Sequence, residues 1–299
     1  MLKRNVARSL TVLSLLLCAC SGSDGETGTG GAGVGGSGNS SSGGTGGSGG
    51  AGSTFDIHFD YRFDAKGLFD DPARRAALEA AGSLWASLLA DEFANVPAGT
   101  EVLSRNPEDP ETPGQVFTLD YEIDDLCVFV GFAPIDGLGG TLAASNNSAA
   151  IGSVSDPDLQ AELSERYLGS DFQPWTGWIA FDQDEAWFYD STPGDAGDIP
   201  AASSDLLSVA LHELGHVLGF GASDAFVAQV VGAEFRGPDA ELFWGGPVPL
   251  SPDGLHIEAS VRVEGHRPLM DPSDAPGERY LPTPLDLAML ADVGYPLVQ

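Results

Sequence analysis

The expected fold of this chain is decided by one apolar stretch, SVALHELGHVLGF, which covers residues 208–220. Apolar residues recur through it at helical spacing, and they predict a buried helix over residues 206–220. His212 and His216 lie four positions apart, so on a helix their rings share one face, one turn apart. Gly219 follows three residues after His216, where a glycine can end the helix and turn the chain.

The polar residues of this helix indicate a metal site. Burying polar side chains is unfavourable unless they have partners, so His212, Glu213 and His216 on such an apolar helix require an explanation. Their order is the His-Glu-x-x-His pattern of zinc hydrolases. Zinc lowers the pKa of a bound water and polarises a substrate carbonyl, while the glutamate serves as general base. The alternative is a histidine pair that only hydrogen-bonds within the core.

With these residues the sequence resembles the metzincin clan of zinc metalloproteases, closely over residues 212–219 and more loosely over residues 177–295. Most metzincins carry a third metal ligand three residues beyond the glycine, where this chain has Ala222, which cannot bind a metal. The layout is closest to the leishmanolysin-like branch, in which an insertion separates the glycine from the third histidine, and the chain looks like a short bacterial version of it. The resemblance implies a zinc-dependent endopeptidase.

The resemblance also implies the rest of the site. The displaced third zinc ligand would be His256, in the stretch LHIE, and Met270, in the stretch LMDP, would form the Met-turn that floors the zinc site. The residues themselves leave alternatives open, because Met270 could equally be a core residue. The other candidate ligands are His266, Glu234, Asp224 and Asp239.

The spacing of the candidates favours His256. A catalytic zinc needs a third protein ligand and one open position. The chain between His216 and His256 is rich in glycine and proline, so it can loop out and return. His266 stands only four residues before Met270, which leaves less room to cross the site.

The remaining patterns predict an α+β fold. Half-buried alternation predicts a strand over residues 55–63, and helical spacing after an acidic cap predicts a helix over 72–93. Further strands are expected over 116–123, 126–132 and 178–181, and a last helix over 286–293. The metzincin-like expectation is a twisted sheet with two long helices in an N-terminal lobe and a small irregular C-terminal lobe with the Met-turn. Residues 55–299 would form this zinc metallopeptidase domain, divided into lobes at 55–221 and 222–299.

The resemblance implies a function for the strand expected over residues 178–181. It resembles the edge strand of the metzincins, to which an extended substrate adds as a further strand. The alternative is an interior strand.

The first residues predict an export signal over 1–19. Basic residues precede an apolar run over 10–17 that is too short to span a membrane. The run ends in Leu-Cys-Ala-Cys, which resembles the bacterial lipobox and implies a lipid on Cys20. Residues 20–54 include 16 Gly and predict a flexible tether. We therefore expect an exported bacterial lipoprotein at the outer membrane or cell surface; an ordinary signal peptide is the alternative.

The composition excludes some functions. With 13 Lys and Arg against 44 Asp and Glu, the formal charge of −31 leaves no basic surface for nucleic acid or for a membrane-surface helix. The expected partners are a peptide or protein substrate and, only through the lipid anchor, the membrane; a monomer is expected.

Three cysteines cannot make a disulfide framework, and Cys127 lies in an apolar run that predicts a buried thiol. Acidic residues over 182–200 could hold structural Ca²⁺, but they lack the spacing of a dedicated calcium loop.

A different class of function is compatible with the same motif. A catalytically silent metzincin-like protein would bind zinc and recognise a peptide or glycan partner without turnover. Glu213 argues against this alternative, because a silent protein has no need of a general base. A processing enzyme that cuts a single partner is the third possibility.

Overall fold

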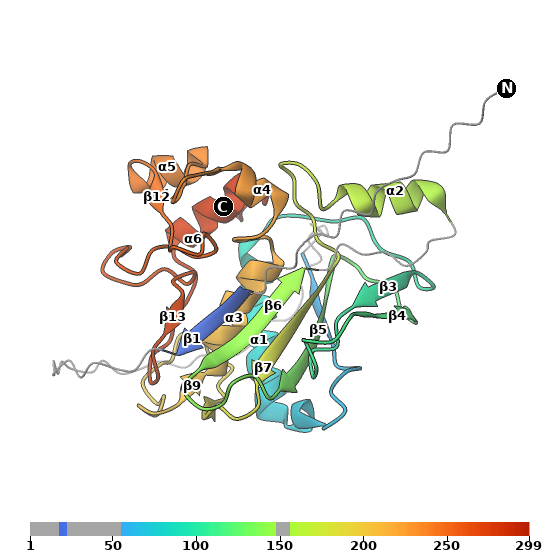
Figure 1. Ribbon diagram of the computed structural model, residues 1–299, viewed down its shortest axis with the longest axis horizontal. Coiled ribbons are helices and arrows are strands. Elements are labelled where there is room, and N and C mark those ends of the chain that lie inside the picture. The colour runs from blue at the N-terminus through green and yellow to red at the C-terminus, as the bar shows by residue number, and fades with distance from the viewer. Residues whose placement is uncertain (1–17, 23–54, 148–155, 299) are drawn as a thin grey trace, which may run out of the picture.

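The computed structural model describes residues 55–147 and 156–298 and, for residues 18–22, the course of the backbone. Its centre is a twisted mixed sheet with the strand order β13-β1-β6-β7-β5-β2 (Figure 1). Strands β2, β5 and β7 run parallel to one another, and β6 runs antiparallel to β7 and β1. The six strands are β1 (Cys18–Gly22), β2 (Ile57–Asp60), β5 (Leu126–Ala133), β6 (Thr141–Asn147), β7 (Thr176–Asp182) and β13 (Ser273–Asp274).

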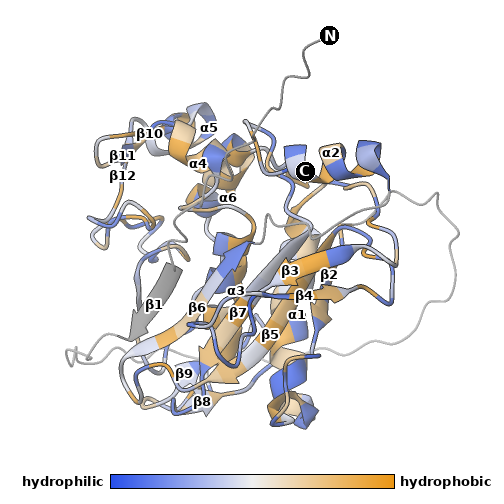
Figure 2. Ribbon diagram, turned by 45° about the vertical axis from the view of Figure 1, so that its right-hand side comes forward, coloured by the Kyte–Doolittle hydropathy of each residue, from blue (hydrophilic) through white to orange (hydrophobic). Residues whose placement is uncertain are grey.

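The core lies between this sheet and two helices. Strands β5 and β7 are buried along their whole length and are continuous apolar runs, as expected of strands covered on both faces (Figure 2). Helices α1 (Pro72–Leu88) and α3 (Leu206–Val217) pack against each other behind the sheet (Figure 1). The indole Nε1 of Trp85 donates a hydrogen bond to the carbonyl of Leu211 at 2.9 Å, which ties α1 to α3.

Shorter elements surround this core. Helix α6 (Pro284–Val293) begins with a capping box, in which the side chains of Thr283 and Asp286 each bond to the backbone of the other. The other elements are η1 (Leu68–Asp70), β3 (Glu101–Ser104), β4 (Gln115–Thr118), α2 (Pro157–Glu165), β8 (Trp187–Phe188), β9 (Ser204–Asp205), α4 (Asp224–Ala228), β10 (Val230–Val231), β11 (Glu234–Phe235), α5 (Pro238–Trp244) and β12 (Val248–Pro249).

The structure confirms the expected elements that carry a long or strongly periodic pattern. The predicted strands and helices are present as β2, α1, β4, β5, β7, α3 and α6, although several are shorter than expected. Helix α1 ends at Leu88 rather than near residue 93, because Leu89 adopts extended backbone angles. The mixed sheet and its helices fit a metzincin-like fold. Cys127 is fully buried in β5 as a free thiol, as its apolar surroundings predict.

The prediction that residues 178–181 form an edge strand is wrong. They lie inside β7, which is bonded to β5 on one side and to β6 on the other. The strand beyond it, β6, has the sequence TLAASNN, which shows neither an apolar run nor alternation and was not anticipated. Helix α2 and the short elements of residues 224–249 were also not anticipated, because each is too short to show a period.

The predicted lipobox coincides with β1. Residues 18–20 pair with residues 143–145 of β6, while Ser21 and Gly22 pair with Ser273 and Asp274 of β13. The rest of the predicted signal and tether lies outside the described residues, so this division of the chain stays a prediction. Among the helices that the structure describes, none is long and apolar enough to cross a membrane.

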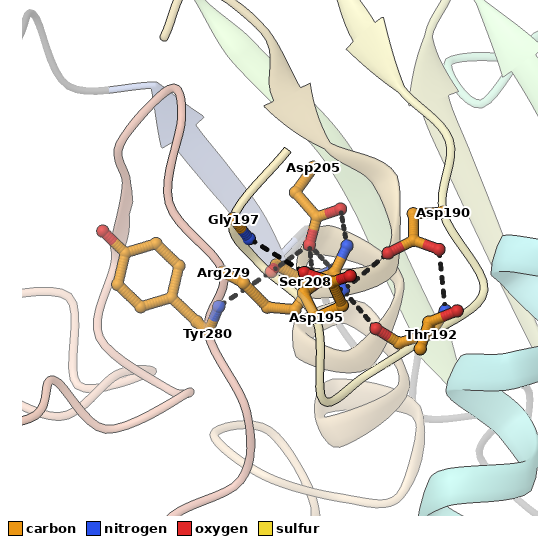
Figure 3. Close-up of polar contacts among 8 residues, drawn as sticks. All are labelled: Asp190, Thr192, Asp195, Gly197, Asp205, Ser208, Arg279 and Tyr280. Carbon is orange, nitrogen blue, oxygen red and sulfur yellow. Dashed lines mark hydrogen bonds and ion pairs between the residues drawn. The ribbon is translucent and has the colours of Figure 1, made fainter. Parts of the chain in front are cut away.

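A buried ion pair fixes the start of α3. The carboxylate of Asp205 caps the helix by accepting hydrogen bonds from the backbone N–H and the hydroxyl of Ser208. The guanidinium of Arg279 donates two hydrogen bonds of 2.9 Å to the same carboxylate and a further one of 3.0 Å to the carboxylate of Asp190. The hydroxyl of Ser208 in turn accepts from the backbone N–H of Tyr280 at 2.8 Å. Figure 3 shows how this cluster joins α3 to the acidic loop and to the segment after β13.

Removing the Asp205 carboxylate is expected to destabilise the whole domain. Asp205→Ala leaves the buried Arg279 without its main partner, so the free energy of unfolding should fall by about 3–5 kcal/mol. Asp71→Ala is the matched control, because Asp71 caps α1 at an exposed position and its loss should cost only about 1 kcal/mol. Urea unfolding of both variants measures the difference. Equal losses would show that the ion pair adds nothing to the cap.

Candidate metal centre

Helix α3 positions the first two histidines. All twelve of its residues are buried, because its apolar side chains pack between the sheet and α1. The Nδ1 atom of His212 lies 2.8 Å from the carbonyl oxygen of Leu269, and the Nδ1 atom of His216 lies 3.0 Å from that of Phe220. Each ring is therefore held by a backbone acceptor, and its Nε2 atom faces the other ring.

His256 joins these two rings from a loop of the C-terminal lobe. Its Nδ1 atom lies 2.9 Å from a carboxylate oxygen of Asp253. The other oxygen of Asp253 accepts hydrogen bonds from the hydroxyl of Ser251 and from the backbone N–H of Leu255 at 2.8 Å. Burial opposes ionisation of Asp253, but these hydrogen bonds hold its pKa below the ordinary value. Asp253 thus orients the His256 ring, which lies outside any helix, as carboxylates commonly do for metal-binding histidines.

The three rings converge through their Nε2 atoms. The Nε2 atom of His216 lies 3.1 Å from that of His212 and 3.2 Å from that of His256. Each Nδ1 faces an oxygen that can only accept, so each Nδ1 carries the proton and each Nε2 presents a lone pair. Three lone pairs this close repel one another unless a cation lies between them.

This geometry fits zinc. Two nitrogen ligands at the usual zinc distance and the tetrahedral angle are about 3.4 Å apart, close to the separations found here. In the part of the chain that the structure describes, His212, His216 and His256 are the one group of three or more metal-binding side chains close enough to share an ion. Three histidines also leave a fourth tetrahedral position open, as in catalytic zinc sites.

Burial keeps the rings in the form that binds metal. Desolvation, and after it the neighbouring His256 ring, lowers the pKa of His212 to about 3. Desolvation and the two neighbouring rings lower the pKa of His216 well below its usual value. Both rings are therefore neutral at physiological pH, so no proton has to leave them before a metal binds.

Glu213 is buried on the same helix. It follows His212 directly in the chain, its side chain is inaccessible to solvent, and its backbone carbonyl accepts a hydrogen bond from the hydroxyl of Ser145 in β6. A carboxylate in a helix this apolar is costly to bury. This cost is the physical reason to look for a chemical role rather than a structural one.

Met270 lies directly against α3. A Cβ atom added at Gly215 would come within 2.6 Å of the Met270 sulfur, so the glycine between the two histidines makes room for this side chain. The carboxylate of Asp286 in α6 accepts hydrogen bonds of 3.0 Å from the backbone N–H groups of Leu269 and Met270. The carbonyl of Met270 accepts from the N–H of Ile257, the residue after His256. The segment at Met270 thereby links the helix histidines, the loop histidine and α6.

The other candidate ligands lie elsewhere. His266 is exposed in a turn, and Glu234 pairs with Arg236 at 2.6 Å in the short sheet of the C-terminal lobe. Asp224 and Asp239 are exposed in the first turns of α4 and α5. Sequence reasoning missed two supporting residues, Asp253 and Asp286. The spacing Thr283-x-x-Asp286 was a readable capping signal for the second, whereas nothing in the sequence marks the first.

Comparison with known families supports this interpretation. The family model of the matrixins matches residues 150–231 of this chain. The matched stretch includes β7 and α3 with His212, Glu213 and His216, and it ends before His256. The match supports a zinc metallopeptidase of the metzincin type. No curated protein matches the chain.

Zinc binding is expected to distinguish the two loop histidines. His256→Ala removes one of three converging nitrogens and should reduce bound zinc from one ion per chain to a small fraction, whereas His266→Ala should retain full zinc. Metal content after dialysis, measured by atomic emission, decides the matter. The opposite pattern would identify His266 as the third zinc ligand, and zinc retained by both variants would favour Glu234 as that ligand.

Proposed function

We propose that this chain is a zinc-dependent endopeptidase in which His212, His216 and His256 hold the ion. The observation that carries the proposal is the convergence of three buried Nε2 atoms, two of them from the helix that also buries Glu213. Bound zinc would polarise a peptide carbonyl and make water more acidic. The similarity to the matrixin model favours a peptide or protein as substrate.

The residues of the chain have distinct parts in this proposal. Glu213 accepts the proton of the attacking water and delivers it to the leaving amine. Asp253 keeps His256 in the tautomer and orientation that present Nε2. Met270, packed on Gly215, would be the Met-turn methionine of this site, and Asp286 fixes the backbone of that turn.

The substrate is proposed to bind as an extended strand along β6, not along β7. The supporting observation is β1, which lies antiparallel to β6, parallel to β13 and in contact with α3. A peptide that makes the same backbone hydrogen bonds would pass close to the metal ligands of α3. Such a peptide takes the place of β1, so binding requires residues 18–22 to leave the sheet or, once the predicted signal over 1–19 has been removed, residues 20–22.

Glu213→Gln is expected to keep its zinc and lose peptidase activity by about 100-fold or more, because an amide cannot accept the proton of the water. Zinc content and cleavage of a library of quenched peptides should be measured on the same preparations, with and without a chelator. Loss of zinc from the variant, or activity near that of the wild type, would contradict the general-base role. Wild-type protein that binds zinc but cleaves no peptide would favour the silent binding protein.

We further propose that Cys20 is lipidated and anchors the protein at the outer membrane or cell surface. The proposal rests on the basic start of the chain, the short apolar run and the lipobox-like Leu-Cys-Ala-Cys. With a formal charge of −31, the chain offers no electrostatic attraction to an anionic membrane that would replace the lipid.

Cys20→Ser is therefore expected to move the protein from the membrane fraction to the soluble fraction of cells that express it. Cys18→Ser is the matched control and should leave the distribution unchanged, because Leu17 precedes Cys18 where a lipobox has a small residue. Fractionation and mass spectrometry of the N-terminal peptide report the outcome. Wild-type protein without lipid on Cys20 would overturn the anchor.

A further inference from the structure

A group of exposed apolar side chains lies in the segment between the helix histidines and the loop histidine. In the part of the chain that the structure describes, ten large hydrophobic side chains are exposed, and five of them fall within residues 227–244. Single exposed apolar residues are common on soluble domains, but a group of them usually marks a contact surface. We call these five the apolar group: Val227, Val231, Leu242, Phe243 and Trp244.

The short helix α5 supplies three consecutive members of the apolar group. Leu242 is 83% exposed, Phe243 46% and Trp244 36%. The start of the helix is fixed on α6, because the carboxylate of Asp292 accepts hydrogen bonds of 2.9 Å from two N–H groups in the first turn of α5. The three side chains are therefore held at the surface on a backbone that is already in place.

Neighbouring elements carry the other two members. Val231 ends strand β10 just before the turn into β11, and Val227 lies near the end of α4. Strand β11 pairs with both β10 and β12, and α5 packs on β12 and α6. Arg236, directly after β11, forms an ion pair of 3.7 Å with Glu241 of α5. Both views place α4, α5 and these strands at one end of the molecule (Figures 1 and 2).

The charges around the apolar group exclude an acidic partner. Residues 224–249 contain four acidic side chains and a single basic one, Arg236. That guanidinium already pairs with Glu234 at 2.6 Å and with Glu241. A contact at this surface therefore gains its free energy from the burial of apolar area and not from charge.

The area and the side-chain types favour a membrane over a second copy of the chain. A stable dimer buries about 800 Å² on each partner, whereas five part-exposed side chains offer roughly 500 Å². Tryptophan, phenylalanine and leucine are the apolar side chains of helices that lie in the membrane interface.

The proposed lipid on Cys20 would bring a membrane within reach. A flexible tether over residues 20–54 has a root-mean-square span of about 30–35 Å, so the domain would stay beside the bilayer. A weak second contact is effective under these conditions, because it forms within an attached molecule.

We propose that the apolar group inserts into the interface of a bilayer of zwitterionic phospholipids. The contact is a second attachment of the domain, additional to the lipid, and needs no basic residues. It takes the nearness of a membrane from the proposed anchor. Because residues 224–249 connect the helix histidines to the loop histidine in the chain, the contact also fixes how the metal centre faces the membrane.

The test uses the full, zinc-loaded chain with Cys20→Ser, so that no lipid contributes to binding. Roughly half of this protein should float with phosphatidylcholine vesicles at about 1 mM lipid, and binding should change less than about twofold between low and high salt. Bromine on the acyl chains should quench part of the tryptophan fluorescence. Trp85, Trp175 and Trp178 are buried, so Trp244→Phe should remove most of the quenching while flotation persists.

The matched variants exchange one exposed leucine each. Leu242→Gln should weaken vesicle binding about 10-fold, whereas Leu168→Gln, just after α2 and away from α5 in Figure 1, should leave it unchanged. Both leucines are mostly exposed, so both variants should unfold at the wild-type temperature.

Absence of flotation, or equal binding by the two leucine variants, overturns the membrane contact. A dimer in sedimentation velocity that Leu242→Gln dissociates, without vesicle binding, also overturns it and assigns the apolar group to a second copy. Lipidation of the wild type and peptide cleavage are measured separately, so a failure of the anchor or of the peptidase does not enter the vesicle result.

Discussion

The site depends on the burial of α3. Its apolar side chains pack against the sheet and α1, and this packing supplies the free energy that keeps two imidazoles and a carboxylate out of water. The same packing sets the rotation of the helix about its own axis. His212 and His216 consequently face the C-terminal lobe together, and Gly215 between them admits Met270. A helix with weaker apolar contacts would leave the two rings free to turn towards solvent.

Buried polar contacts add to the shared hydrophobic core in holding residues 222–299 in place on α3. At the start of the helix Arg279 forms an ion pair with Asp205. Further along, the carbonyl of Leu269 accepts a hydrogen bond from His212. Asp286 then fixes the backbone of Leu269 and Met270 from α6. These contacts are buried, so each carries more free energy than the same contact at the surface. They explain how a segment of short elements can place the Nε2 atom of His256 at 3.2 Å from that of His216, within about 0.2 Å of the spacing that zinc requires.

The proposed chemistry combines the two lobes. The sheet contributes β6 and the C-terminal segment contributes β13, and an extended chain fits between them, as β1 does. Beside that path lie the three histidines, so the motif helix would supply the reaction to a chain bound between β6 and β13.

Local patterns in the sequence were sufficient for α3, for α1 and for the apolar strands β5 and β7, because burial of a helix face or of a whole strand leaves a periodic or continuous apolar signal. They were also sufficient for His212, Glu213 and His216, whose relation is set by one helical turn. The spacing of glycine and proline together with the family resemblance favoured His256, but only the tertiary structure brought it to the other two rings and left His266 in a turn. The position of β6 between β1 and β7 and the support from Asp253 were likewise decided by tertiary structure. Each of these features joins segments that are distant in the chain or too short to be periodic, and such contacts follow from how the lobes pack, which local spacing does not encode.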